Sequence, residues 1–204
     1  EAGQCGVVVR KNAPVTGARE APGGFELELR GGERLTARAL LLASGGDRGG
    51  YALARDLGHT VAPPVPSLFT FVVRDGRLEG LAGVASAEAR LRLAAAGLEQ
   101  RGPVLVTHWG LSGPAVLRLS AWGARALSDA AYRADLEVNW VPAHSPETMR
   151  ERLTALKGQN GRKLAAAHSP LPEVPHRLWR SLALAAGLGA EQPWAEITRG
   201  QIQA

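Results

Sequence analysis

The sequence predicts a mixed α/β protein built from two parts. Short strand patterns bounded by glycine turns occupy most of the chain up to position 141, and helical patterns dominate from Ser145 onward. The apolar run Ala39–Ala43 has the composition of a strand in a buried parallel sheet. Ala62–Pro66 holds three prolines in five residues and therefore cannot be helical. We expect two domains joined at Pro63 to Pro66.

The first 43 residues are expected to form β-structure. Apolar and polar side chains alternate from Phe25 to Arg30, as is typical of a half-exposed strand. Gly31 and Gly32 can adopt the positive φ angles of a tight hairpin, so the chain should turn there. A short helix over Gly50–Gly58 should follow, with Gly58 as its C-cap. The expected strands cover residues 6–10, 15–20, 25–30, 35–38 and 39–43.

The second part should begin with strands and end with helices. Pro114 suits the first turn of a helix that is expected to run to Ser128. Ser145 followed by Pro146 is a helix start signal, and a further helix is expected over Pro175–Ala186. The expected strands cover residues 67–74, 87–93, 103–108 and 135–141.

The distribution of charge argues against a nucleic-acid partner. The net charge is +5, but the 24 basic residues are spread along the chain and interleaved with 19 acidic ones. A nucleic-acid footprint needs Lys and Arg gathered on one face. We therefore expect no nucleic acid among the partners.

Composition also bears on location and on metals. The apolar run at Ala39–Ala43 is far shorter than the roughly 20 residues that span a bilayer, so no membrane is expected. The single cysteine, Cys5, excludes an intrachain disulfide and fits a reducing cytoplasm. The five histidines show no paired ligand spacing, so no metal site is expected.

Leu40–Gly46 is the first segment with a functional pattern. A buried strand that ends in small residues lets a ligand approach the carboxyl edge of a sheet, where open α/β proteins bind cofactors. The alternative is a simple glycine turn after a strand.

Thr107–Leu117 is the second such segment, with the expected form of strand, tight loop and helix. Ser112 is expected to cap the helix, whose free amides could hold an anion or a flavin carbonyl. His108, at the strand end, is a candidate for proton transfer. The alternative is a capped helix with a structural histidine. A hydrolase elbow is disfavoured, because that motif needs glycine where Pro114 stands.

These two segments, with others between them, resemble the HI0933-like family of FAD-dependent oxidoreductases. The Thr107–Ser120 stretch is the most specific part of the resemblance. The matching stretches, in order, are Ala43–Gly46, Gly50–Ala54, Leu57–Val61, Pro64–Leu68, Leu81–Val84 and Thr107–Ser120.

The resemblance implies a fold in which an insert interrupts a cofactor domain. Residues 1–62 would be part of a Rossmann-like FAD-binding domain. Residues 63–194 would be a β-rich insert, a bent β-structure carrying a small helical bundle at about 145–190. Residues 195–204 would lead back toward the FAD-binding domain.

The resemblance also implies site residues. Val15 would contact the adenine, and Ser44, Gly45 and Gly46 would lie near the ribose and diphosphate. Thr198 and Gly200 would bind the cofactor from the returning segment. The substrate cleft would be formed by Thr107, Gly110, Ser112 and Gly113, with His108 as the catalytic residue.

The implied activity is hydride transfer between flavin and a small organic substrate, with NAD(P)H as a candidate reductant. The glycine-rich strand–turn–helix that holds the FAD pyrophosphate does not occur in this sequence. We therefore expect an internal fragment that is inactive alone and binds FAD weakly or not at all. The rival interpretation is a free-standing binding or interaction module derived from the insert domain. The oligomeric state stays open.

Overall fold

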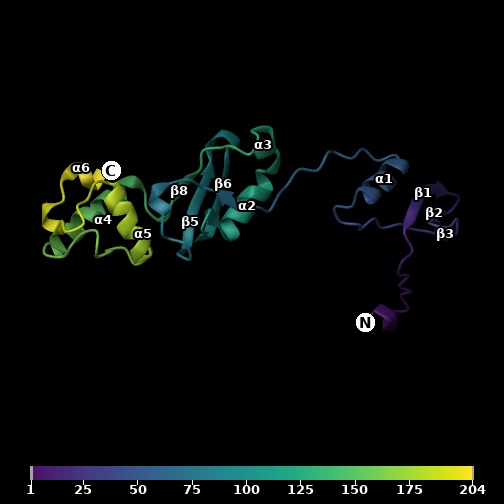
Figure 1. The fold of residues 1–204 in the computed structure, drawn as a ribbon, viewed down its shortest axis with the longest axis horizontal. Helices are drawn as coiled ribbons and strands as arrows, with labels where there is room; N and C mark the ends of the chain where they lie inside the picture. Colours follow the sequence, from purple (N-terminus) through teal and green to yellow (C-terminus); the bar gives the residue numbers. More distant parts are fainter. Residues whose placement is uncertain (1, 204) are drawn as a thin grey trace. The chain divides into compact units, whose positions relative to one another are not determined.

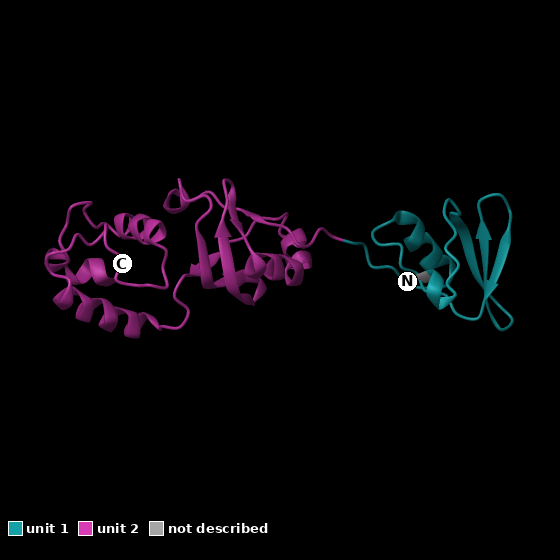
Figure 2. Ribbon diagram, turned by 90° about the horizontal axis from the view of Figure 1, so that it is seen from below, with its two compact units in different colours: residues 1–64 teal, residues 65–204 magenta. Residues whose placement is uncertain are grey.

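The chain divides into two compact units, Glu1–Pro64 and Val65–Ala204 (Figure 2). A computed structural model describes residues 2–203. The division between the units falls inside the proline-rich segment 62–66. The units are described separately below.

The first unit is a three-stranded antiparallel sheet with one helix against it (Figure 1). The predicted strands 15–20, 25–30 and 35–38 and the predicted helix are confirmed. The helix begins two residues earlier than predicted, and Gly58 lies in the left-handed region directly after its C-cap, Leu57. The elements are η1 (Ala2–Cys5), β1 (Val15–Ala21), β2 (Gly24–Leu29), β3 (Arg34–Ala37) and α1 (Arg48–Asp56).

Two predicted strands in this unit are wrong. Residues 6–10 and 39–43 are irregular, and Val8 and Leu41 are largely exposed. A strand is stabilised by hydrogen bonds to a neighbour. Among residues 2–203, no strand pairs with either segment. An apolar composition alone therefore did not produce a strand.

The second unit begins with a five-stranded antiparallel sheet in the order β4-β7-β6-β5-β8 (Figure 1). Its first strand is much shorter than predicted, because Leu68 takes a left-handed φ of 57° that interrupts an extended backbone. The strand β7 lies where a glycine-rich loop was expected. The strands are β4 (Phe71–Val72), β5 (Ala85–Leu93), β6 (Leu98–Val106), β7 (Gly110–Ser112) and β8 (Glu137–Asn139), with η2 (Gly76–Leu78) and η3 (Ala94–Ala96) between them.

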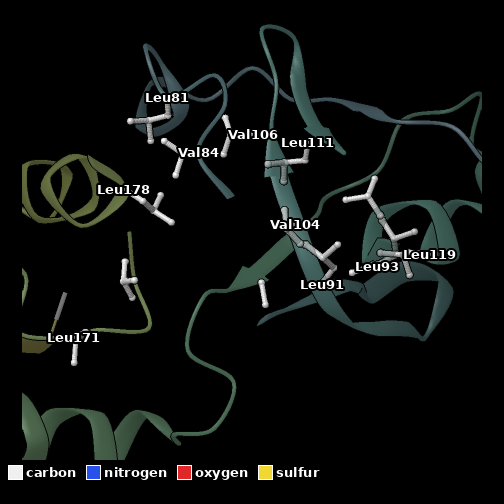
Figure 3. Packing of buried hydrophobic residues seen from close by; sticks show 14 of the residues in the cluster. Leu81, Val84, Leu91, Leu93, Val104, Val106, Leu111, Leu119, Leu171 and Leu178 are labelled. Carbon is white, nitrogen blue, oxygen red and sulfur yellow. The ribbon is translucent and has the colours of Figure 1, made fainter. Parts of the chain in front are cut away.

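The predicted helix over 114–128 is divided in two at Gly123. The parts are α2 (Pro114–Trp122) and α3 (Ala124–Asp129), and α2 packs against β5 and β6. Figure 3 shows the core that results. Its labelled members are Leu81, Val84, Leu91, Leu93, Val104, Val106, Leu111, Leu119, Leu171 and Leu178.

The last part of the second unit is helical, as predicted. Ser145 caps its first helix by accepting a hydrogen bond from the Thr148 amide. Leu171 and Leu178 join the core of the sheet, and a smaller cluster forms around Trp194 and Ile197. The elements are α4 (Pro146–Gln159), α5 (His176–Ala185), η4 (Trp194–Glu196) and α6 (Arg199–Gln203).

Candidate functional site

The first unit contains a mainly apolar cavity of about 490 Å³. Val15 and Ser44, which the sequence analysis assigned to the cofactor, both line it. Gly45 and Gly46 follow directly, and a Cβ atom at either position would meet nothing within 4 Å, so their backbone is open to a ligand. The other lining residues are Pro14, Leu27, Leu40, Leu41, Leu42, Ala43, Asp47, Gly49, Gly50 and Leu53.

The start of α1 lies close against this glycine segment. Gly50 is buried, and a Cβ atom there would stand 1.7 Å from the Ser44 hydroxyl oxygen. Only glycine at position 50 leaves room for Ser44 at its place in the cavity wall.

The N-terminus of α1 already holds a carboxylate. Asp47 accepts hydrogen bonds from the amides of Gly49 at 2.9 Å and Gly50 at 3.3 Å. These amides would otherwise be free to bind an anion. The cavity therefore suits an apolar ring and a hydroxyl-bearing group, whereas the Asp47 charge opposes a phosphate near the helix start.

In the second unit, His108 and Trp109 form the tip of the tight turn between β6 and β7. The Thr107 amide donates to the Gly110 carbonyl oxygen at 2.8 Å, and the Val73 amide donates to the Trp109 carbonyl oxygen at 3.0 Å. Both turn residues are exposed, Trp109 by 55%. The backbone of the turn is thus anchored while its two ring side chains reach solvent.

Apolar side chains flank this turn on the outer face of the sheet. Val106 and Leu111 are buried in the core, so Leu105, the neighbour of Val106, faces outward by the alternation of a strand. Leu105 is 38% exposed, and Val72, which is paired with Gly110, is 70% exposed. Together with Trp109 they form an exposed apolar surface.

Thr107 has a buried hydroxyl without a partner in the described part of the chain, whereas Gly110 is in close contact with the backbone of β4. The Thr107 hydroxyl is buried and has no hydrogen-bond partner within residues 2–203. Gly110 has a φ of 150°, and a Cβ atom there would lie 2.3 Å from the Phe71 carbonyl oxygen. The pairing of β4 with β7 therefore accounts for glycine at position 110.

The prediction that Ser112 caps α2 is wrong. Ser112 belongs to β7 and is paired with Leu105, while Gly113 occupies the N-cap without a side-chain bond. Pro114 stands in the first turn, as predicted. Ala115 and Val116 are 0% exposed, so the first amides of α2 cannot be reached by an anion or a flavin carbonyl.

Thr198 and Gly200 lie at the start of α6. The Thr198 amide donates to the Gln201 side-chain oxygen at 3.0 Å, which closes the first turn of that helix. Both residues belong to the second unit, whereas Val15 and Ser44 belong to the first. Their participation in one cofactor site stays a prediction.

Two local features were missed in the sequence. Asp47 stands directly before a helix, where an acidic residue is a capping signal, but the helix was expected to begin too late for Asp47 to be its cap. Trp179 and Trp194 stack with ring centroids 6.0 Å apart. Nothing in their spacing indicated that contact.

Two further features are absent from residues 2–203. No helix in this part of the chain combines the length and apolar character needed to cross a membrane. No three His, Cys, Asp or Glu side chains in it come together as a metal site would require.

Comparison with known proteins confirms the resemblance recognised in the sequence. A family model described as HI0933-like protein barrel and H2TH domain matches residues 65–204. The 3-dehydro-bile acid delta(4,6)-reductase of Clostridium scindens is 32% identical over 134 residues, which cover 59% of this chain and 32% of that protein. The ribosomal RNA dihydrouridine synthase of Escherichia coli is 29% identical over 174 residues, which cover 80% of this chain and 42% of that protein. The chain thus spans less than half the length of these curated relatives.

Proposed function

This chain belongs to the HI0933-like protein family, and on that premise we propose that it is part of an FAD-dependent reductase. The proposed reaction is reduction of a carbon–carbon double bond conjugated to a carbonyl group. One observation carries the proposal: both curated relatives are named for the reduction of a double bond. One name specifies double bonds of a 3-dehydro bile acid, and the other specifies dihydrouridine, which is uridine reduced at a ring double bond.

We assign the cofactor to the cavity of the first unit, as part of a Rossmann-like domain. Val15 would contact the adenine, and Ser44, Gly45 and Gly46 would lie near the ribose and diphosphate, where the charge of Asp47 weakens the binding of the diphosphate. The open backbone of both glycines supports this assignment. Reduced FAD would supply the hydride, and NAD(P)H is the proposed reductant. Thr198 and Gly200 would complete the site.

We assign the substrate to the turn between β6 and β7. The exposed apolar side chains of Val72, Leu105 and Trp109 offer apolar contacts to an apolar substrate. Reduction of a conjugated double bond needs one proton at the carbon beside the carbonyl. His108 is exposed at the tip of the turn, and a ring nitrogen of His108 would deliver that proton. Thr107, Gly110, Ser112 and Gly113 would shape the cleft.

A small molecule is the proposed substrate in preference to nucleic acid. Arginines on the sheet are paired with carboxylates: Arg92 with Glu137 at 3.2 Å and Arg101 with Glu88 at 3.0 Å. Paired charges leave little positive field for a phosphate backbone. The proposed location is the cytoplasm.

Purification of the full-length protein from the open reading frame that encodes these residues tests the proposal. We expect a yellow protein that releases about one FAD per chain on denaturation and consumes a conjugated enone when a reductant is supplied. A colourless protein that binds no added FAD would contradict the proposal and favour the rival interpretation of a binding module.

A further inference from the structure

The second unit contains a groove of about 670 Å³, which is lined mainly by apolar residues. One wall consists of the six consecutive residues 69–74, which include β4. Consecutive side chains of a strand point to opposite faces of the sheet, so a groove that contacts all of them lies along an edge of the strand. Because β7 covers the other edge of β4, the groove lies along the free edge.

The backbone of Val72 faces this groove. The Val73 amide donates a hydrogen bond to the Trp109 carbonyl oxygen at 3.0 Å, across the antiparallel pair of β4 and β7. Residues that bond to the neighbouring strand alternate with residues that do not, so the N–H and C=O of Val72 point away from β7. Within residues 2–203, no strand pairs with this edge of β4. Val72 is 70% exposed, and its edge can therefore accept a further strand.

The opposite wall of the groove makes the free edge of β4 a recess. This wall belongs to the segment that leads into β8, the strand at the other end of the sheet, and it includes Tyr132 and Leu136. The Tyr132 ring meets the Phe69 ring edge to face, with centroids 5.7 Å apart. The β4 edge of a second copy would bring its own β7 and its own wall with it. A recessed edge therefore fits a single extended segment better than a second copy of the sheet.

We infer that this groove binds an extended peptide segment of a partner protein, which adds a strand to the sheet by hydrogen bonds to the N–H and C=O of Val72. In this mode of recognition, main-chain bonds provide affinity and alternate side chains provide specificity. Leu93 and Leu127 line the groove and belong to the core, so alternate side chains of the segment should be apolar. Arg74 and Asp135, the charged residues of the lining, have opposite signs, and the segment therefore needs no net charge. The inference does not depend on the proposed flavin chemistry.

Two probes of nearly the same shape separate main-chain pairing from apolar filling. The first is acetyl-Thr-Val-Thr-Val-Thr-Val-amide, whose six residues match the length of the β4 wall. The second has the same side chains, but esters replace its internal amide bonds, which removes the N–H donors without adding bulk. The 204-residue chain is labelled with ¹⁵N and titrated with each probe, while its amide signals are followed by NMR. We expect the peptide to move the Val72 amide signal downfield, to slow the exchange of this amide with solvent, and to bind roughly 5- to 150-fold more tightly than the ester.

Variants test the same inference without relying on one substitution. Val72→Pro removes the N–H that points into the groove and keeps the bonds between β4 and β7, because proline is tolerated in an edge strand at such a position. It should weaken peptide binding roughly fivefold or more, whereas Val72→Thr, which keeps the N–H, should leave the affinity within about twofold. Ala134→Trp should fill part of the groove and weaken binding at least roughly tenfold, whereas Ala95→Trp, exposed and outside the lining, should leave it unchanged.

Three results would overturn the inference of a peptide site. The first is no saturable binding of the peptide by the unsubstituted chain, and the second is equal binding of the peptide and the ester. The third is protection of the Val72 amide that rises with the concentration of the chain when no peptide is present, which would assign this edge to a second copy.

Discussion

Gly110 lies directly against Phe71, so that a Cβ atom at position 110 would stand 2.3 Å from the Phe71 carbonyl oxygen. This approach is the pairing of β4 with β7. Beside this pair, the Val73 amide donates a hydrogen bond to the Trp109 carbonyl oxygen. This bond anchors the two-residue turn of His108 and Trp109 to the chain that follows β4. Gly110 is therefore required by strand pairing, whereas the exposed side chains of His108 and Trp109 are free to contact a substrate.

Gly110→Ala should destabilise the second unit by about 2–3 kcal/mol, because alanine clashes with β4 and is strained at a φ of 150°. Urea unfolding measures the change. Gly76→Ala is the control, since a Cβ atom there meets nothing within 4 Å. Equal stability of the two variants would contradict the close contact between Gly110 and β4.

His108→Ala in the full-length protein should lower turnover roughly a hundredfold while FAD content stays unchanged. Stability should change by less than about 0.5 kcal/mol, since the side chain is exposed. His59→Ala, also exposed, is the matched control. Unchanged turnover with a lowered melting temperature would leave His108 a purely structural residue.

Asp47→Asn should raise the affinity of this chain for FAD about 2- to 5-fold at low salt, from a weak starting value. Asparagine keeps the cap of α1, and the substitution removes a negative charge near the proposed diphosphate position. Equilibrium dialysis with FAD measures the affinity. Asp56→Asn, at the other end of α1, is the control. An equal rise in FAD affinity in both variants would contradict the proposed position of the diphosphate near Ser44–Gly46.

Glu173→Gln should reduce the dependence of stability on acidic pH. The guanidinium of Arg152, hydrogen-bonded at 2.6 Å, lowers the pKa of the Glu173 carboxyl from its ordinary value near 4.5. A lowered pKa means that the pair stabilises the fold above about pH 4.5 and loses this contribution as the pH falls through the folded-state pKa.

The expected loss in Glu173→Gln at pH 7 is at most about 1 kcal/mol, because the pair is partly exposed. Urea unfolding at several pH values should show the variant and the unsubstituted chain converging in acid, and also in 1 M salt at pH 7. A difference that is constant with pH would assign the loss to packing and not to the charge.

The sequence was sufficient to predict elements that local patterns determine. The hairpin at Gly31–Gly32 and the helix capped by Ser145 depend on residues within a few positions of each other, and both are present. The elements that failed depend on distant partners. Ala39–Ala43 has strand composition but no neighbour to pair with in the described residues. β7 lies between two partners, β6 across a short turn and β4, which is about 40 residues earlier.

Some of the predictions for the candidate site agree with the structure, and others do not. Val15 and Ser44 were assigned by resemblance and do line one cavity, although their role stays a prediction. Ser112 was expected to cap α2 because serine before proline is a strong local signal. The strand pairing of Ser112 with Leu105 overrides that signal. Asp47 was not predicted as the N-cap of α1, because the helix was expected to begin at Gly50 and it begins at Arg48.

Anaerobic mixing of the reduced full-length protein with conjugated compounds tests the proposed reduction most directly. A steroid 4-en-3-one, uridine and 2-cyclohexen-1-one are mixed in turn, with their saturated counterparts as controls, and the visible flavin absorbance is followed. At least one conjugated compound should restore the oxidised absorbance at a rate that rises with its concentration, with the saturated product formed in equal amount. A flavin that stays reduced with all three until oxygen is admitted would contradict the proposed function.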